Sequence, residues 1–189
     1  MNVLLIDNYD SFTYNLVHYL ESFDVDVTTV FNDQILIEDI QAFDKIVFSP
    51  GPGLPAEAGL MNEIISTYAD SKPMLGVCLG FQAIVEVFGG QLYNQLEVKH
   101  GVAVKAQFDT SSTLFKETAP EFEIGLYHSW AVHEKDLPKV FKPTARSIEG
   151  VLMAFEHKTR PIFGVQFHPE SILSQYGKQI VQNFLFNFE

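Results

Sequence analysis

The chain has one cysteine, Cys78, and it stands where a short apolar run meets the start of a helical pattern. Residues 76–80 read Gly-Val-Cys-Leu-Gly, which is typical of a nucleophile held on a sharp strand-to-helix turn. A helix N-terminus favours an anion, so this position promotes the reactive thiolate. The backbone N–H of Leu79 is a candidate donor to an oxyanion. The alternative is a buried cysteine that packs as a small apolar side chain, and the turn pattern argues against it.

A histidine and a carboxylate lie two positions apart in residues 164–170, Gly-Val-Gln-Phe-His-Pro-Glu. The residue before a proline is biased to extended geometry, and side chains two apart on an extended segment share a face. Glu170 can therefore accept the imidazole N–H of His168 and leave the other nitrogen for Cys78. This arrangement predicts a nucleophile, a base and a group that orients the base. The alternative is an ordinary strand-end histidine beside a solvated glutamate.

Two loops follow other predicted strands. Residues 49–53, Ser-Pro-Gly-Pro-Gly, combine stiff prolines with glycines that allow close backbone approach. A backbone N–H there is a candidate second oxyanion donor, although a plain turn has the same composition. Residues 8–13 open a helix and resemble a hydroxyl-rich phosphate loop, but they lack the Walker pattern. We therefore expect helix capping by Asp10 or Ser11 and contact with a partner.

Short apolar segments alternate with helical periodicity over the first 90 residues. Strands are predicted at 3–6, 25–31, 45–49 and 73–77, and helices at 12–23, 56–69 and 79–88. This alternation favours a parallel sheet with helices on both faces. Further strands are predicted at 102–108, 145–149, 151–156 and 162–167, before a helix at 171–188. Few helices separate these later strands, so they indicate an antiparallel extension of the same sheet.

No repeat or linker-like stretch indicates a domain boundary, so we expect one α/β domain over residues 1–189. The predicted architecture is a three-layer, open and mostly parallel sheet with helices on both faces and an antiparallel extension. In open sheets of this kind, ligands bind outside the carboxyl ends of the strands. The candidate residues above follow strand ends, which agrees with that rule.

The chain of 189 residues is 47% hydrophobic and carries a net charge of −12. This charge repels phosphate backbones and anionic lipids, so we expect neither a nucleic-acid partner nor a membrane partner. One cysteine makes no intrachain disulfide, and no cluster has metal-ligand spacing, so neither metal nor cofactor is expected. We find no signal peptide and no apolar run near the length of a membrane span, so the expected location is the cytoplasm.

Together these motifs resemble those of the class I glutamine amidotransferases. The resemblance rests on residues 76–82 and 167–171. Segments 7–16 and 49–53 narrow it to the glutaminase subunits of anthranilate synthase (component II) and of aminodeoxychorismate synthase. It runs from Val3 to about Phe188.

The resemblance implies a mechanism and a binding site. Cys78 would attack the amide carbon of L-glutamine. His168 would protonate the leaving ammonia and then activate water, while Glu170 orients His168. Backbone N–H groups of Gly53 and Leu79 would form the oxyanion hole. The glutamine-binding residues that it implies are Gly51, Pro52, Gly53, Leu79, Gln82, Ser129 and Trp130.

The chain departs from the family pattern at two positions. Relatives commonly carry leucine or arginine at the position of Trp130, and they often carry lysine at that of Val102. The first departure would reshape the pocket rim, and the second would change interface polarity. Two histidines in family motifs, His100 and His128, are interpreted as structural or interfacial.

The resemblance also implies a partner. The length leaves no room for a chorismate-binding synthase, so ammonia is expected to pass to a separate synthase chain in a hetero-oligomer. We expect an exposed patch near Tyr9, Phe12 and Trp130 for this contact. The alternatives are a free-standing γ-glutamyl hydrolase or cysteine peptidase, an amidotransferase for another synthetase, and a flavodoxin-like binding module. The sequence does not separate the tryptophan pathway from the folate pathway.

Overall fold

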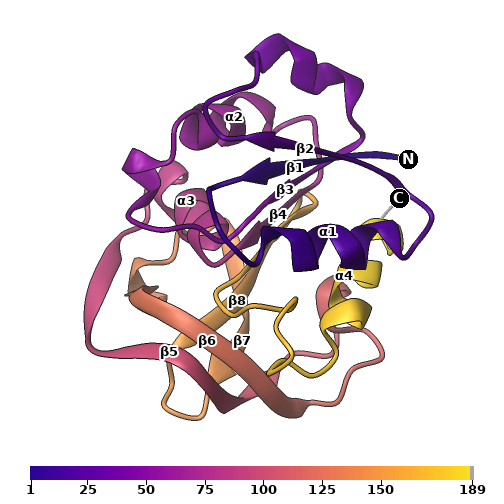
Figure 1. Cartoon of the computed structure of the whole chain (residues 1–189). Helices are drawn as coiled ribbons and strands as arrows, with labels where there is room; N and C mark the ends of the chain where they lie inside the picture. Colours follow the sequence, from indigo (N-terminus) through magenta and orange to yellow (C-terminus); the bar gives the residue numbers. More distant parts are fainter. Residues whose placement is uncertain (188–189) are drawn as a thin grey trace.

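The computed structural model describes residues 1–187, except for the side chains of residues 96 and 97, and its nine described strands form one sheet (Figure 1). Five strands are parallel: β1 (Asn2–Asp7), β2 (Asp26–Phe31), β3 (Lys45–Phe48), β4 (Met74–Val77) and β9 (Ile162–Val165). Four more continue the sheet in antiparallel pairing: β5 (Leu92–Phe108), β6 (Glu121–Val132), β7 (Phe141–Ser147) and β8 (Leu152–His157). The order β2-β1-β3-β4-β9-β8-β7-β5-β6 confirms the predicted parallel sheet with an antiparallel extension.

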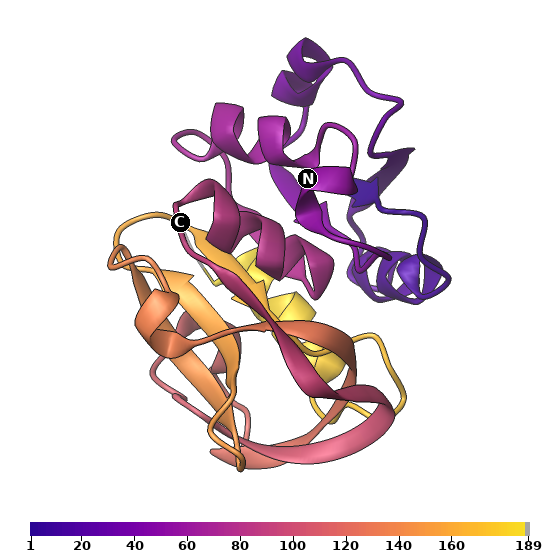
Figure 2. The same ribbon diagram turned by 90° about the vertical axis from the view of Figure 1, so that its left-hand side faces the viewer.

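Helices cover both faces of the parallel part. Helices α1 (Thr13–Glu21) and α4 (Gly177–Phe186) pack on one face, and α2 (Met61–Tyr68) and α3 (Leu79–Val87) pack on the other. The alternation along β1 explains the two cores, since Val3 and Leu5 join the first and Leu4 and Ile6 join the second. Figures 1 and 2 show β5, β6, β7 and β8 gathered at the end of the molecule away from β1 and β2. Short 3-10 helices lie at Ile37–Ala42, Pro55–Glu57, Thr113–Phe115 and Glu134–Asp136.

The prediction from sequence did not include one of the described strands. No strand was predicted over β6, although it pairs with β5 from Leu92 to Gln107. Gly125 interrupts its β-propensity, and an added Cβ there would make a tight contact of 3.0 Å with Leu173 Cβ. Strand β5 also begins ten residues before the predicted 102, at Leu92. These two strands stabilise each other over a distance in sequence that local patterns do not report.

Two predicted helices were too long at their N-termini. The helix predicted at 56–69 is a 3-10 turn followed by α2, because Gly59 has a φ of +53° and a Cβ there would lie 2.6 Å from Asn32. The helix predicted at 171–188 begins only at Gly177. The preceding segment instead bonds to β6, where the N–H of Gly125 donates to Ser174 Oγ at 2.9 Å. Residue 188 of that prediction lies outside the described residues.

None of the helices within residues 1–187 is long and apolar enough to cross a membrane.

Candidate active site

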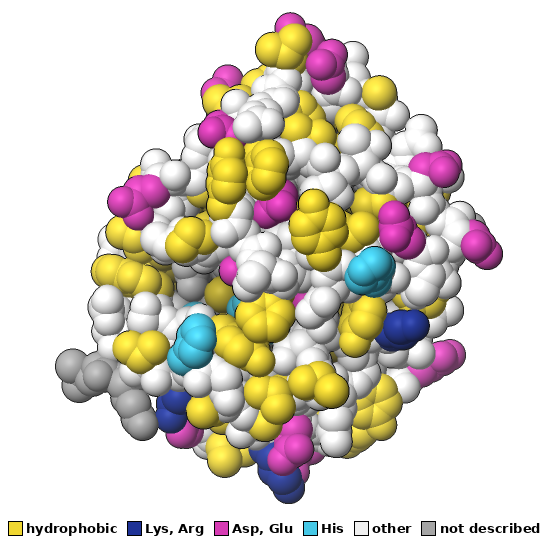
Figure 3. Space-filling model, viewed as in Figure 1, with side chains coloured by type: hydrophobic (Ala, Val, Ile, Leu, Met, Phe, Trp, Pro, Cys, Tyr) yellow, Lys and Arg dark blue, Asp and Glu magenta, His cyan; other side chains and the backbone are white. Residues whose placement is uncertain are grey.

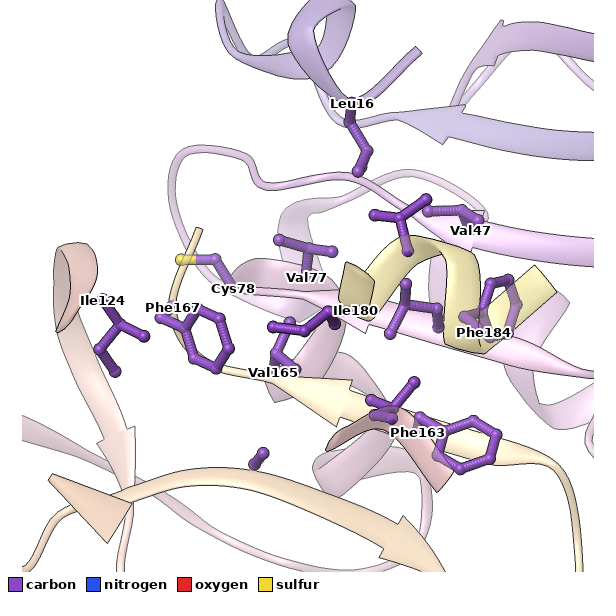
Figure 4. Close-up of a cluster of buried hydrophobic side chains, with 14 of the residues drawn as sticks. Leu16, Val47, Val77, Cys78, Ile124, Phe163, Val165, Phe167, Ile180 and Phe184 are labelled. Carbon is purple, nitrogen blue, oxygen red and sulfur yellow. The ribbon is translucent and has the colours of Figure 1, made fainter. Parts of the chain in front are cut away.

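The turn between β4 and α3 holds Cys78 in an unusual backbone conformation. Cys78 has a φ of +52° and immediately precedes the first residue of α3, a strained geometry that costs about 1–3 kcal/mol in a non-glycine residue. A Cβ on Gly76 would lie 2.5 Å from the carbonyl of Gly80, and a Cβ on Gly80 would lie 2.6 Å from Phe48 Cβ. Both flanking glycines are therefore required by packing. Figure 4 shows Cys78 at one end of an apolar cluster, with its sulfur pointing away from Val77.

His168 and Glu170 follow β9, the strand that neighbours β4 in the sheet. Their side chains are buried and face each other, with 2.7 Å between His168 Nδ1 and Glu170 Oε1. A carboxylate can only accept here, so Nδ1 carries a proton and Nε2 is the ring nitrogen that Glu170 does not engage. The backbone N–H of His168 donates to the Gly125 carbonyl at 3.1 Å, which anchors this turn to β6.

The charges around His168 favour its protonated form. Burial lowers the pKa of His168, but the neighbouring Cys78 and the Glu170 carboxylate outweigh it and raise the pKa to about 10. At neutral pH the imidazole is therefore a cation beside the thiol and is ready to donate a proton to a leaving group. Nε2 is buried and makes no hydrogen bond within the described part of the chain. It is the ring nitrogen that remains for an interaction with the neighbouring Cys78.

Gln166 belongs to the same arrangement and was missed by the sequence reasoning. It is fully buried, and its Nε2 lies 3.6 Å from Cys78 Sγ. Its Oε1 accepts from Gln82 Nε2 at 3.2 Å, and that same nitrogen donates to the Trp130 carbonyl at 3.0 Å. The available signal was its position directly after β9 and two residues before His168.

Two cavities meet at Cys78. The first, here called the Gln82 cavity, has a volume of about 160 Å³ and is lined by Gly51, Pro52, Gly53, Cys78, Gln82, Tyr127, His128, Ser129 and Trp130. The second, the His168 cavity, has a volume of about 190 Å³ and is lined by Asp10, Ser11, Phe12, Pro50, Gly51, Cys78, His100, Tyr127 and His168. Cys78 borders both, so a molecule in either cavity can reach the sulfur.

The structure brings the predicted site residues together at these cavities. Six of the seven implied glutamine-binding residues line the Gln82 cavity beside Cys78. The seventh, Leu79, opens α3 next to Cys78, and its side chain lines an adjoining cavity with Asn8 and Pro52. Glu170 is connected to the site by its hydrogen bond with His168.

Hydrogen bonds of Asn8 hold the loop at 49–53 against the loop that follows β1. Asn8 Nδ2 donates to the Ser49 carbonyl at 2.8 Å, and the Asn8 N–H donates to Ser49 Oγ at 2.9 Å. A Cβ on Gly51 would lie 2.5 Å from Asn8 Cβ. The backbone at Gly51 therefore packs against Asn8 more closely than a residue with a side chain would allow.

The start of α1 differs from the expected capping. Its N-cap residue is Phe12, which makes no side-chain cap. Asp10 Oδ1 accepts from the Phe12 N–H at 2.8 Å, and Asp7 Oδ1 accepts from Thr13 Oγ1 at 2.9 Å. The expected helix capping by Asp10 or Ser11 was therefore wrong for the N-cap of α1, because the Asp10 carboxylate bonds within the turn before the helix.

Apolar side chains close in sequence to the cavity-lining residues differ in their exposure. Tyr9 is 52% exposed, whereas Phe12 and Trp130, expected in the same patch, are half-buried. Tyr14 and Ile172 are more exposed, at 64% and 98%. Figure 3 shows apolar side chains spread among acidic ones over the face that carries α1. The expected patch is therefore exposed at Tyr9 and half-buried at Phe12 and Trp130.

Comparison with known proteins identifies the family of the chain. Residues 4–188 match the family described as Glutamine amidotransferase class-I, and the chain belongs to this family. It is 46% identical over 187 residues to "Anthranilate synthase component II" of Haloarcula marismortui, covering 96% of each chain. It is 42% identical over 185 residues to "Aminodeoxychorismate/anthranilate synthase component 2" of Bacillus subtilis, covering 97% of this chain and 95% of that one.

The fold has a close solved neighbour. A crystal structure from Thermoplasma acidophilum, whose description assigns it to a GMP synthase, superposes with a TM-score of 0.88 at 29% identity, over 98% of this chain and 92% of that one. The resemblance inferred from the motifs is thus confirmed at the level of the family and the fold.

Proposed function

We propose that this chain, acting as one domain over residues 1–189, is the glutaminase component of a two-chain synthase. It hydrolyses L-glutamine and supplies ammonia to a separate chorismate-using chain. The observation that carries the proposal is the arrangement of Cys78 and His168 on one cavity, with Glu170 bonded to the far side of the imidazole at 2.7 Å. Such an arrangement supports acyl transfer through a thioester.

The first half of the reaction uses the thiolate and the imidazolium. Cys78 Sγ attacks the side-chain amide carbon of glutamine, and the carbonyl oxygen becomes an oxyanion. Backbone N–H groups of Gly53 and Leu79 are the proposed donors to that oxygen. His168 then gives its proton to the amide nitrogen as the carbon–nitrogen bond breaks, so ammonia leaves and a glutamyl thioester remains.

The second half removes the thioester. His168, now neutral, takes a proton from water as the water attacks the thioester carbon. The carbon–sulfur bond breaks, glutamate leaves, and the thiolate and imidazolium are restored. Glu170 holds the imidazole in the tautomer that presents Nε2 in both steps.

The His168 cavity is the proposed exit for ammonia. The proton donor borders this cavity, so the leaving nitrogen is released on that side of Cys78. Asp10, Ser11 and Phe12 line the other wall, and they come from the segment that narrows the resemblance to chorismate-using synthases. A partner docked on the apolar surface around Tyr14 and Ile172 would receive ammonia before solvent protonates it.

The relatives support a partner of this kind. The Haloarcula relative is named as component II of anthranilate synthase, and the Bacillus relative is named for both synthases. We propose anthranilate synthase as the main assembly and aminodeoxychorismate synthase as the second candidate, which the Bacillus name favours. We place the reaction in the cytoplasm, where a thiol nucleophile stays reduced.

The test mixes the chain with each candidate synthase component, chorismate and glutamine, and identifies the product. The Cys78→Ala variant should abolish glutamine-dependent synthesis and leave ammonia-dependent synthesis by the partner intact. Retained glutamine-dependent synthesis in Cys78→Ala would show that the nucleophile is misassigned. Equal glutamine hydrolysis with and without any synthase component would instead favour a free-standing γ-glutamyl hydrolase.

A further inference from the structure

His128 is a buried histidine on β6 that the reaction steps above do not use. It is 4% exposed, and its Nδ1 lies 2.9 Å from the carbonyl oxygen of Trp130. A carbonyl oxygen only accepts hydrogen bonds, so Nδ1 must carry a proton. In the neutral imidazole, Nε2 is then a lone-pair acceptor.

The surroundings keep His128 neutral. Burial lowers the pKa of His128 to about 4, and the positive charge of His168 acts in the same direction. The hydrogen bond to Trp130 opposes this shift without reversing it. At neutral pH, Nε2 of His128 is therefore an acceptor and not a donor.

This acceptor has no partner within residues 1–187. Nε2 of His128 is buried and makes no hydrogen bond there, although the residue lines the Gln82 cavity. A buried unpaired acceptor costs about 1–3 kcal/mol, so a site that retains one has a use for it. Neighbouring polar groups are already engaged, since the Trp130 carbonyl receives both His128 Nδ1 and Gln82 Nε2.

We propose that His128 is a substrate-binding residue whose Nε2 accepts a hydrogen bond from an N–H group of glutamine in the Gln82 cavity. This inference rests on the proposed function. Glutamine offers N–H donors at its side-chain amide and at its α-ammonium group. If the side-chain amide is the donor, His128 also rejects glutamate, because a carboxylate would place lone pairs against the lone pair of Nε2.

Two substitutions distinguish the roles of the two ring nitrogens of His128. His128→Asn places its amide near the position of Nδ1, so it keeps a donor for the Trp130 carbonyl and loses the acceptor at Nε2. His128→Gln places its amide near the position of Nε2, so it keeps an acceptor there and loses the bond to Trp130. The pair therefore distinguishes substrate binding from support of the backbone.

The measurement is calorimetric titration of L-glutamine into the full chain carrying Cys78→Ala, with a synthase component added if the chain alone binds weakly. We expect His128→Asn to weaken binding about 5- to 100-fold, and His128→Gln to weaken it less. The inference is overturned if His128→Asn binds within twofold of its parent. It is also overturned if His128→Gln is weakened as much as His128→Asn, because the Trp130 bond would then be the important one.

A second ligand identifies the donor. The γ-methyl ester of L-glutamate lacks side-chain N–H groups and keeps the α-ammonium group. If the side-chain amide is the donor, His128→Asn binds this ester as well as its parent does. If the α-ammonium group is the donor, His128→Asn weakens binding of the ester by the same factor as binding of glutamine. Failure of the parent chain to bind glutamine under any condition would count against the proposed function itself, and so differs from failure of the His128 variants.

Discussion

Replacing Gly80 by alanine tests whether packing of α3 against β3 sets the geometry at Cys78. The added Cβ would lie 2.6 Å from Phe48 Cβ and 2.7 Å from the Phe48 carbonyl oxygen. Ordinary carbon contacts are about 3.5–4.0 Å, so α3 must move by about 1 Å. Phe48 is fully buried in β3 and has no room to yield.

The magnitude follows from two opposing effects on the folded state. Overpacking costs about 1–3 kcal/mol, whereas alanine is favoured over glycine in a helix by about 1 kcal/mol. The net loss of unfolding free energy should be about 0–2 kcal/mol. Activity should suffer more, because a misplacement of about 1 Å at a reacting group can cost about 100-fold in rate.

The assay is glutamine-dependent product formation with the synthase component, with ammonia-dependent formation as the internal control and urea unfolding for stability. Gly150→Ala is the matched control. Gly150 lies in the turn between β7 and β8 with a φ of +82°, and no described atom would lie within 4 Å of the added Cβ. It should lose about 1–2 kcal/mol of stability from backbone strain and keep its activity. The reasoning fails if Gly80→Ala keeps a third of wild-type turnover, or if Gly150→Ala loses as much.

Three further substitutions test other contacts. Gln166→Leu removes the donor to Cys78 Sγ and should lower glutamine turnover and the rate of thiol alkylation by about tenfold; an unchanged alkylation rate would contradict this. The pKa of His168 is raised to about 10 in the folded chain, above about 6.5 in the unfolded chain. The protonated imidazole therefore stabilises the folded state fully below about pH 6.5, and this stabilisation is lost as the pH rises toward about 10. Urea titrations across that window should show the unfolding free energy of wild type falling relative to His168→Gln, and parallel curves would refute the assignment. Asn183 donates to two backbone carbonyls at 2.8 Å, so Asn183→Ala should lose about 2–3 kcal/mol, which the same titration measures.

Local sequence was sufficient where the physical cause lies in neighbouring residues. The turn at Cys78 needs small residues on both sides, and the glycines at 76 and 80 meet that need within five positions. The pairing of His168 with Glu170 was also predictable from their spacing, but the expected extended geometry was wrong, because Pro169 and Glu170 lie in a turn that the Ser171 N–H closes on the His168 carbonyl at 3.2 Å. The parallel sheet and the triad candidates were therefore predictable.

Tertiary structure decided what depends on residues far apart in the chain. Strand β6 is stabilised by its pairing with β5, and its glycine lies in tight packing against Leu173. The bond from Gln166 to Cys78 and the unpaired Nε2 of His128 appear only when β6, β9 and α3 converge. Composition and spacing show which groups can do chemistry, but the pKa of a buried group and the satisfaction of its hydrogen bonds depend on which side chains surround it. Only the folded chain determines those neighbours.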